Sequence, residues 1–393
     1  MKILVLSFYY APDLSAGSFR TTALVEQLVK AAPVGAHIDV LTTQPNRYAS
    51  FNQTVPAHET DGTVSITRFP LPSHKSGMVD QAKAYVSFFR AVRQATRGRH
   101  YDLVYATSSR LFTAFLGAIV AKRTRSPLYL DIRDIFVDTI ADILPGRIST
   151  FGLPVFRAIE HYAIRSAARI NVVSEGFLPY FRERFPAQTY DCYTNGIDDA
   201  FLAAPIPEQP TGEARKLVLY AGNIGEGQGL HRILPQLAQA CSDYQFLVIG
   251  DGGRREALEI ALWETSVNNV TIAPPVRRAE LIALYAKADV LFLHLNAYPA
   301  FEKVLPSKLF EYAATGKPIL AGIAGYSRSF VQSEIDNASV FAPCDAQAGA
   351  AALRSLHLGT TPRVGFIEKY KRDNIMTRLA QRLVEMASAP AHR

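Results

Sequence analysis

The feature that most limits the fold of this chain is a repeated alternation of short apolar segments with helix-like stretches. Six apolar segments of the first half have the length and residue types of strands: residues 2–8, 37–42, 64–69, 103–106, 128–132 and 170–173. Six more follow in the second half, at residues 217–221, 245–249, 270–273, 290–293, 318–322 and 339–341. Strands separated by helices indicate βαβ units, so we expect an α/β protein with doubly wound parallel sheets.

A proline-bearing segment, residues 199–214, divides this pattern into two halves and is expected to be a linker. A chain of 393 residues is also longer than one hydrophobic core usually holds. We therefore predict an N-terminal domain over residues 1–198 and a C-terminal domain over residues 215–365. Each half opens with a strand, a glycine-bearing loop and a helix, which predicts two Rossmann-like domains facing a cleft. The last helical stretch, residues 366–393, either packs on its own half or crosses back to the first.

Composition narrows the class of partner and the compartment. The net charge of +7 suits an anionic partner such as a nucleotide, a nucleic acid or an acidic lipid surface. A nucleic acid is disfavoured because no recognised binding module is present and the charge is not concentrated in one tail. The three cysteines are far apart and fit neither a metal site nor a disulfide framework, so we expect a reducing compartment. The longest apolar segment, residues 111–121, is too short to span a bilayer, which favours a cytoplasmic location.

Residues 303–320 carry the strongest chemical signal. Pro306 is expected early in a helix that Gly316 and Pro318 end. The free amides at the start of that helix, together with Lys308, would attract an anion. Glu311 lies on the same face, where its carboxylate could accept two hydrogen bonds from a ribose diol. The alternative is an ordinary helix with a Lys308–Glu311 surface pair, and the spacing alone does not choose between the two.

Two glycine-bearing loops follow the first strand of each half. The loop of residues 221–229 has four glycines between a strand and a helix, so its backbone can approach a phosphate closely. The loop of residues 10–20 contains Gly17, which permits close approach of a ligand, and is followed by Arg20. In both places a plain structural turn is the alternative.

A third group of polar residues surrounds the end of the strand at residues 128–132. Asp131, Arg133, Asp134 and Asp138 lie where ligands bind in open parallel sheets. They would either position an acceptor hydroxyl or form a static network of salt bridges.

The order of these motifs resembles the retaining GT-B glycosyltransferases of the "glycosyl transferases group 1" type. The resemblance covers nearly the whole chain and rests on residues 10–12, 173–175, 194–198, 220–222, 249–253, 280–290 and 311–318. The form Leu-Pro-Ser-Lys-Leu-Phe-Glu-Tyr at residues 305–312, with Asp-Ile-Arg-Asp upstream, is similar to the bacterial subgroup that builds O-antigen, capsule and colanic-acid polysaccharides.

The resemblance implies a metal-independent transfer of a sugar, with retention, from a nucleotide sugar to a lipid-linked saccharide. It implies no cofactor besides the donor substrate, for which a UDP-sugar is favoured. Glu311 matches the family residue that binds ribose, and Val276 matches one whose backbone contacts the base. Backbone amides of Val304, Leu305 and Ser307 match the site that holds the diphosphate.

The chain departs from the family pattern at three places. The first glutamate of the family's Glu-(seven residues)-Glu motif falls on Lys303, with Glu302 beside it. The phosphate-binding arginine and lysine that follow Gly222 in the family fall on Asn223 and Gln228. Arg133 stands where a histidine is common.

These departures require another cation at the diphosphate. We expect Lys308 or Lys303 to supply it, and Arg133, Asp134, Lys303 and Lys308 to form the catalytic group. A GT-B sugar epimerase, and a degenerate GT-B protein that binds a nucleotide or a partner without catalysis, are the alternatives.

A basic segment suggests contact with an anionic membrane. Residues 75–99 contain six basic residues and one acid, with an apolar helical face and a basic one. The simpler interpretation is an amphipathic helix with a solvated basic face. The further hypothesis is peripheral contact with the inner face of the cytoplasmic membrane.

Overall fold

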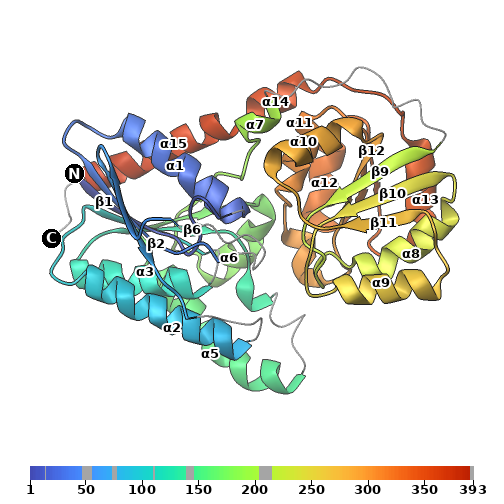
Figure 1. The fold of residues 1–393 in the computed structure, drawn as a ribbon. Coiled ribbons are helices and arrows are strands. Elements are labelled where there is room, and N and C mark those ends of the chain that lie inside the picture. Colours follow the sequence, from blue (N-terminus) through green and yellow to red (C-terminus); the bar gives the residue numbers. More distant parts are fainter. Residues whose placement is uncertain are drawn as a thin grey trace. The chain divides into compact units, whose positions relative to one another are not determined.

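The computed structural model describes residues 1–13, 15–46, 55–72, 78–108, 111–138, 146–202 and 215–389. The chain divides into two compact units, each with its own parallel sheet (Figure 1). The N-terminal unit comprises Met1–Asn195 and Arg372–Arg393, and the C-terminal unit comprises Gly196–Lys371.

The N-terminal unit contains an eight-stranded sheet in the order β3-β4-β2-β1-β5-β6-β7-β8. Its strands are β1 (Lys2–Leu6), β2 (His37–Thr43), β3 (His58–Asp61), β4 (Val64–Phe69), β5 (Leu103–Thr107), β6 (Leu128–Ile132), β7 (Arg169–Val172) and β8 (Tyr190–Cys192). All pairs are parallel except β3–β4. Every strand that the sequence predicts here is present, and β3 and β8 are additional. The search for apolar segments does not detect these two strands, because β3 is short, polar and fully exposed and β8 has only three residues.

The helices of this unit cover both faces of the sheet (Figure 1). They are α1 (Ala16–Ala31), α2 (Met78–Ala95), α3 (Leu111–Thr124), α5 (Gly146–Ser166), α6 (Leu178–Arg184) and α15 (Arg372–Ser388), with a 3-10 turn η1 (Glu175–Phe177). α1 and α15 lie together on one face, and their apolar residues share a core with β1, β2 and β5. Because both faces are covered, the central strands are mostly apolar on both faces.

The C-terminal unit has six parallel strands in the order β11-β10-β9-β12-β13-β14. They are β9 (Lys216–Ala221), β10 (Tyr244–Ile249), β11 (Val270–Ala273), β12 (Val290–His294), β13 (Ile319–Gly322) and β14 (Ala338–Phe341), as the sequence predicts. Its helices are α7 (Asp199–Leu202), α8 (Leu230–Ala240), α9 (Arg255–Glu264), α10 (Arg278–Lys287), α11 (Lys308–Ala314), α12 (Gly325–Glu334), α13 (Ala346–Ser355) and α14 (Val364–Tyr370), with a 3-10 turn η2 (Pro299–Lys303). Renumbered from its first strand, the sheet has the Rossmann order 3-2-1-4-5-6.

The boundaries between the units differ from those expected. The first crossing falls after Asn195 rather than at residue 198, because Phe201 of α7 is buried in the C-terminal core and stacks on Tyr285. The segment expected as a linker therefore begins with a helix, and residues 203–214 lie outside the described part of the chain.

The C-terminal stretch is two helices rather than one. In α14, Phe366 and Tyr370 pack on Phe310 and Phe330 of the C-terminal unit, which extends that unit to Lys371. α15 instead belongs to the N-terminal unit, where Met376 and Leu379 are fully buried.

Candidate functional site

The sheet of the C-terminal unit positions its polar residues at one edge. The strand order reverses between β9 and β12, and ligands of open parallel sheets bind at the carboxyl ends of the strands on either side of such a point. Gly222 follows β9 directly, and His294 is the last residue of β12.

Lys308 extends over Gly222 at this edge. The backbone of Gly222 has a φ of +154°, and a Cβ there would lie 2.9 Å from the Lys308 Nζ. Glycine is therefore required both by the backbone and by the lysine above it. No carboxylate of the described residues lies within 4.0 Å of the Lys308 ammonium, whose pKa burial lowers and Glu311 partly restores. A partly buried ammonium without a close counter-ion is suited to an anionic ligand.

Glu311 contacts Tyr285, whereas an ordinary surface helix would pair it with Lys308. It is in the first turn of α11, and its Oε2 accepts a hydrogen bond of 3.5 Å from the Tyr285 hydroxyl. The surface pair with Lys308 is therefore not formed as an ion pair. Tyr285 is buried between Phe201 and Tyr312, so its hydroxyl is a fixed hydrogen-bond donor to the Glu311 side chain.

The start of α11 differs from the expectation. The helix begins at Lys308 with Ser307 as its N-cap, so Pro306 precedes it by two residues instead of lying inside it. The Val304 amide donates to the Phe301 carbonyl at 3.3 Å, which removes it from the group of free amides. The amides of Leu305 and Ser307 have no acceptor among the described residues.

The glycine-bearing loop before α8 is fixed from two sides. The Asn223 Nδ2 donates to the Gln228 Oε1 at 2.8 Å, so the two residues that replace the family's cations bond to each other. The Cys344 amide donates to the His294 Nε2 at 2.9 Å, so the His294 Nδ1 carries the proton and donates to the Gln228 carbonyl at 2.6 Å. Burial lowers the pKa of His294 to about 4, which keeps the ring neutral. The loop is thus rigid and uncharged where Asn223 and Gln228 stand.

Three other predicted site residues lie in loops and turns of the same unit. Lys303 ends η2, and the Glu302 side chain is exposed, while its backbone packs against Gly325 at the start of α12. Val276 lies in the loop after β11 and packs against the core. Within the described residues, neither Glu302 nor Val276 has a hydrogen bond or ion pair to Gly222, Lys308 or Glu311.

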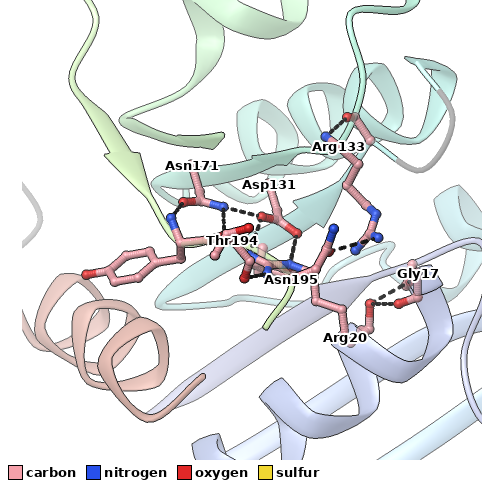
Figure 2. A network of polar contacts seen from close by, with 12 residues as sticks. Gly17, Arg20, Asp131, Arg133, Asn171, Thr194 and Asn195 are labelled. Carbon is pink, nitrogen blue, oxygen red and sulfur yellow. Dashed lines mark hydrogen bonds and ion pairs between the residues drawn. The ribbon is translucent and has the colours of Figure 1, made fainter. Parts of the chain in front are cut away.

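The N-terminal unit contains a buried polar network at the end of β6 (Figure 2). Arg20 of α1 makes a bidentate pair with the Asp131 carboxylate, at 2.9 and 3.0 Å. The Tyr105 hydroxyl and the Asn171 side-chain amide also donate to that carboxylate, at 2.8 and 2.6 Å. Arg20 donates further to the Thr194 and Tyr193 carbonyls, at 2.6 and 2.8 Å. Of the two arrangements expected from the sequence, Asp131 therefore belongs to a static network of salt bridges and does not stand free to position an acceptor hydroxyl.

The other predicted residues of this unit are placed separately. Gly17 is buried in the first turn of α1, where its carbonyl accepts from the Thr21 hydroxyl. Arg133 follows β6, and its guanidinium reaches the Asn195 side chain at 3.2 Å. Asp134 lines a small cavity together with Glu160, whose pKa burial raises to about 7 although the Tyr180 hydroxyl donates to it at 2.7 Å. Asp138 is not part of the Asp131 network.

Sequence reasoning missed three residues that organise these sites: Asn171, Tyr285 and His294. Asn171 and His294 are fully buried on otherwise apolar strands, and a polar residue in such a strand is the signal that could have identified them. Tyr285 lies on α10, far from Glu311 in sequence, and no local pattern pairs the two.

Two family models match successive parts of the chain. "Glycosyl transferase 4-like domain" matches residues 17–191, and "Glycosyl transferases group 1" matches residues 206–373. The two matches correspond to the two Rossmann-like units. The chain is a GT-B glycosyltransferase.

Individual proteins resemble this glycosyltransferase along most of its length. "Putative colanic acid biosynthesis glycosyl transferase WcaI" of Escherichia coli (strain K12) is 24% identical over 346 residues, 80% of this chain and 82% of that protein. Sucrose-phosphate synthase from Thermosynechococcus elongatus has a TM-score of 0.66 at 17% identity, covering 98% of this chain and 96% of that one. Anabaena HepE in complex with UDP-glucose has a TM-score of 0.63 at 17% identity, covering 98% of this chain and 100% of that one. At such identities the structural likeness shows the GT-B fold.

Proposed function

We propose that this glycosyltransferase moves a sugar from a nucleotide-diphosphate donor, with a UDP-sugar favoured, to a hydroxyl of a lipid-linked saccharide, with retention and without a metal. The observation that carries the donor assignment is the Lys308 ammonium, which lies over Gly222 with no close carboxylate among the described residues and with Glu311 one turn away. A diphosphate would supply the missing anion, and Glu311 would accept hydrogen bonds from the ribose.

The arrangement supports a diphosphate site that does without the family's arginine and lysine. Asn223 and Gln228 are neutral and bonded to each other, so Lys308 is the cation at the end of β9. Lys308, Lys303, Arg133 and Asp134 remain the catalytic residues proposed from the sequence. The likeness to HepE, which binds UDP-glucose, supports a UDP-sugar, and the likeness to WcaI supports a role in surface polysaccharide biosynthesis.

A nucleotide screen followed by a transfer assay tests this function. We expect a UDP-sugar to raise the melting temperature more than GDP-, dTDP- or ADP-sugars, because a ligand stabilises the state that binds it. With that donor and polyprenyl-diphosphate-linked saccharides, we expect transfer that survives EDTA and gives a product with the donor's anomeric configuration by NMR. Loss of transfer on chelation, restored by Mg²⁺ or Mn²⁺, would contradict metal independence.

The same assays distinguish the alternatives. Interconversion of the donor sugar without an acceptor would identify an epimerase. Tight nucleotide binding without transfer or donor hydrolysis across a broad panel of acceptors would identify a binding protein.

We further propose peripheral membrane contact through α2. Tyr85, Phe88 and Val92 are buried in the unit, as the amphipathic interpretation predicts, while Arg90 and Arg93 are exposed. No helix in the described part of the chain is long and apolar enough to cross a membrane. Co-sedimentation with liposomes should rise with anionic lipid and fall with salt. Equal binding to neutral vesicles, or none, would refute the contact, and Arg90→Gln with Arg93→Gln should weaken it.

A further inference from the structure

One donor group of the Arg133 guanidinium lacks a partner in the part of the chain that the structure describes. Its backbone amide donates to the Ser108 hydroxyl at 2.9 Å, and its guanidinium NH2 donates to the Asn195 Oδ1 at 3.2 Å (Figure 2). The Nη1 group is shielded from solvent and has no hydrogen-bond partner among the described residues. No carboxylate lies within 4.0 Å of this guanidinium in the described part of the chain.

The Asp131 carboxylate makes its hydrogen bonds to groups other than Arg133. Both oxygens of Asp131 accept from Arg20, and Tyr105 and Asn171 add one hydrogen bond each. Asp131 therefore pairs directly with Arg20 and acts on Arg133 only as a more distant charge.

A third arginine lies close to Arg133. The Arg372 Nε donates to the Asn195 carbonyl at 3.1 Å, on the same residue that Arg133 contacts. Burial, and then Arg20, lower the pKa of Arg133 to about 10, with Arg372 acting in the same direction. The surroundings of Arg133 therefore add positive charge that an anionic group would offset.

A guanidinium that is removed from water without an anionic partner raises the free energy of the folded protein. Its planar array of donors matches a carboxylate or a phosphate, which would supply that partner. We propose that Arg133 and Asn195 form an anion subsite of the N-terminal unit that binds a carboxylate or phosphate group of the acceptor saccharide. The inference rests on the proposed function, since it assigns the acceptor to this unit. Two sources share this chemistry: a sugar acid within the saccharide, and the phosphate that links it to lipid.

Binding of matched sugar pairs tests the subsite and distinguishes the two sources. Methyl glucuronide is compared with methyl glucoside, and N-acetylglucosamine 1-phosphate with N-acetylglucosamine. All titrations are made by NMR in saturating UDP, so that the Lys308 site is filled. In wild type we expect the anionic member of at least one pair to bind roughly tenfold to a hundredfold more tightly, the range of one charge-assisted hydrogen bond. Preference for glucuronide assigns a sugar acid, and preference for the 1-phosphate assigns the lipid linkage.

Variants show whether Arg133 is responsible. Arg133→Gln should abolish the preference, and Arg133→Lys, which retains the charge, should keep part of it. Arg123→Gln removes an exposed arginine from the last turn of α3 in the same unit and should leave the preference unchanged.

Two results would overturn the subsite: neither anionic sugar binding better than its neutral partner, or a preference that persists in Arg133→Gln. A calorimetric titration of UDP in the same samples reports on the proposed function separately. Absence of UDP binding contradicts the UDP donor site, whereas UDP binding without any preference for an anionic sugar contradicts the subsite alone.

Discussion

Glu311→Ala is expected to weaken nucleotide binding by one to several orders of magnitude while leaving the fold intact. The Glu311 carboxylate is partly exposed at the carboxyl edge of the sheet, and among the described residues its hydrogen-bond partner is the Tyr285 hydroxyl at 3.5 Å. It can therefore accept hydrogen bonds from a ribose diol. Two charge-assisted bonds contribute about 1.5–3 kcal/mol each in a dry site. A helix surface pair would contribute only about 0.2–0.5 kcal/mol.

Calorimetry with the preferred nucleoside diphosphate measures this loss. A 2′,3′-dideoxyribose analogue should bind wild type and Glu311→Ala almost equally, because it lacks the hydroxyls that the carboxylate would hold. Glu280→Ala removes an exposed glutamate from α10 of the same unit and should bind like wild type. If Glu311→Ala binds the normal nucleotide as tightly as wild type does, the ribose assignment is wrong.

Arg20→Met is expected to destabilise the protein by about 3–5 kcal/mol, the usual cost of removing one partner from a buried ion pair. Arg20 and Asp131 are 1% and 0% exposed, so the remaining carboxylate cannot reach water. Urea unfolding measures the loss. Arg20→Met combined with Asp131→Asn should recover much of it, because the buried carboxylate charge is removed together with its guanidinium partner. Arg123→Met on the surface of the same unit should cost almost nothing, and an equal cost for both arginines would contradict the role of the network.

The pH dependence of this loss has a defined sign. In wild type, burial raises the pKa of Asp131, but Arg20 lowers it more, so the carboxylate stabilises the fold above its unfolded pKa and less as the pH falls. Arg20→Met removes the strongest group that lowers the pKa of Asp131, while burial still raises it and Arg133 and Asn171 still lower it, so this pKa is higher in the variant than in wild type. The stability of the variant relative to wild type therefore falls as the pH rises. We expect the difference from wild type to be larger at about pH 8 than at about pH 5.

The local pattern was sufficient for the strands and for most of the helices. All twelve predicted strands are present, because in a doubly wound sheet both faces are covered and the strands are apolar runs that the sequence displays directly. The short exposed strand β3 and the three-residue β8 carry no such run. The helix at residues 308–314 and its end at Gly316, where φ is +69°, were also predictable, although Pro306 stands outside it.

The sequence alone thus determined the two-unit α/β architecture, and it indicated the family resemblance and Lys308 and Glu311 as candidate site residues, because these depend on spacing along the chain. Only the tertiary structure decided which of the polar residues meet. The pairing of Arg20 with Asp131 spans 111 positions, and α15 joins the N-terminal core from the opposite end of the chain. The contact of Lys308 with Gly222, the hydrogen bond of Tyr285 to Glu311 and the unpaired Arg133 likewise depend on how the strands are ordered. Such contacts are set by close packing between segments distant in sequence, and no local periodicity records them.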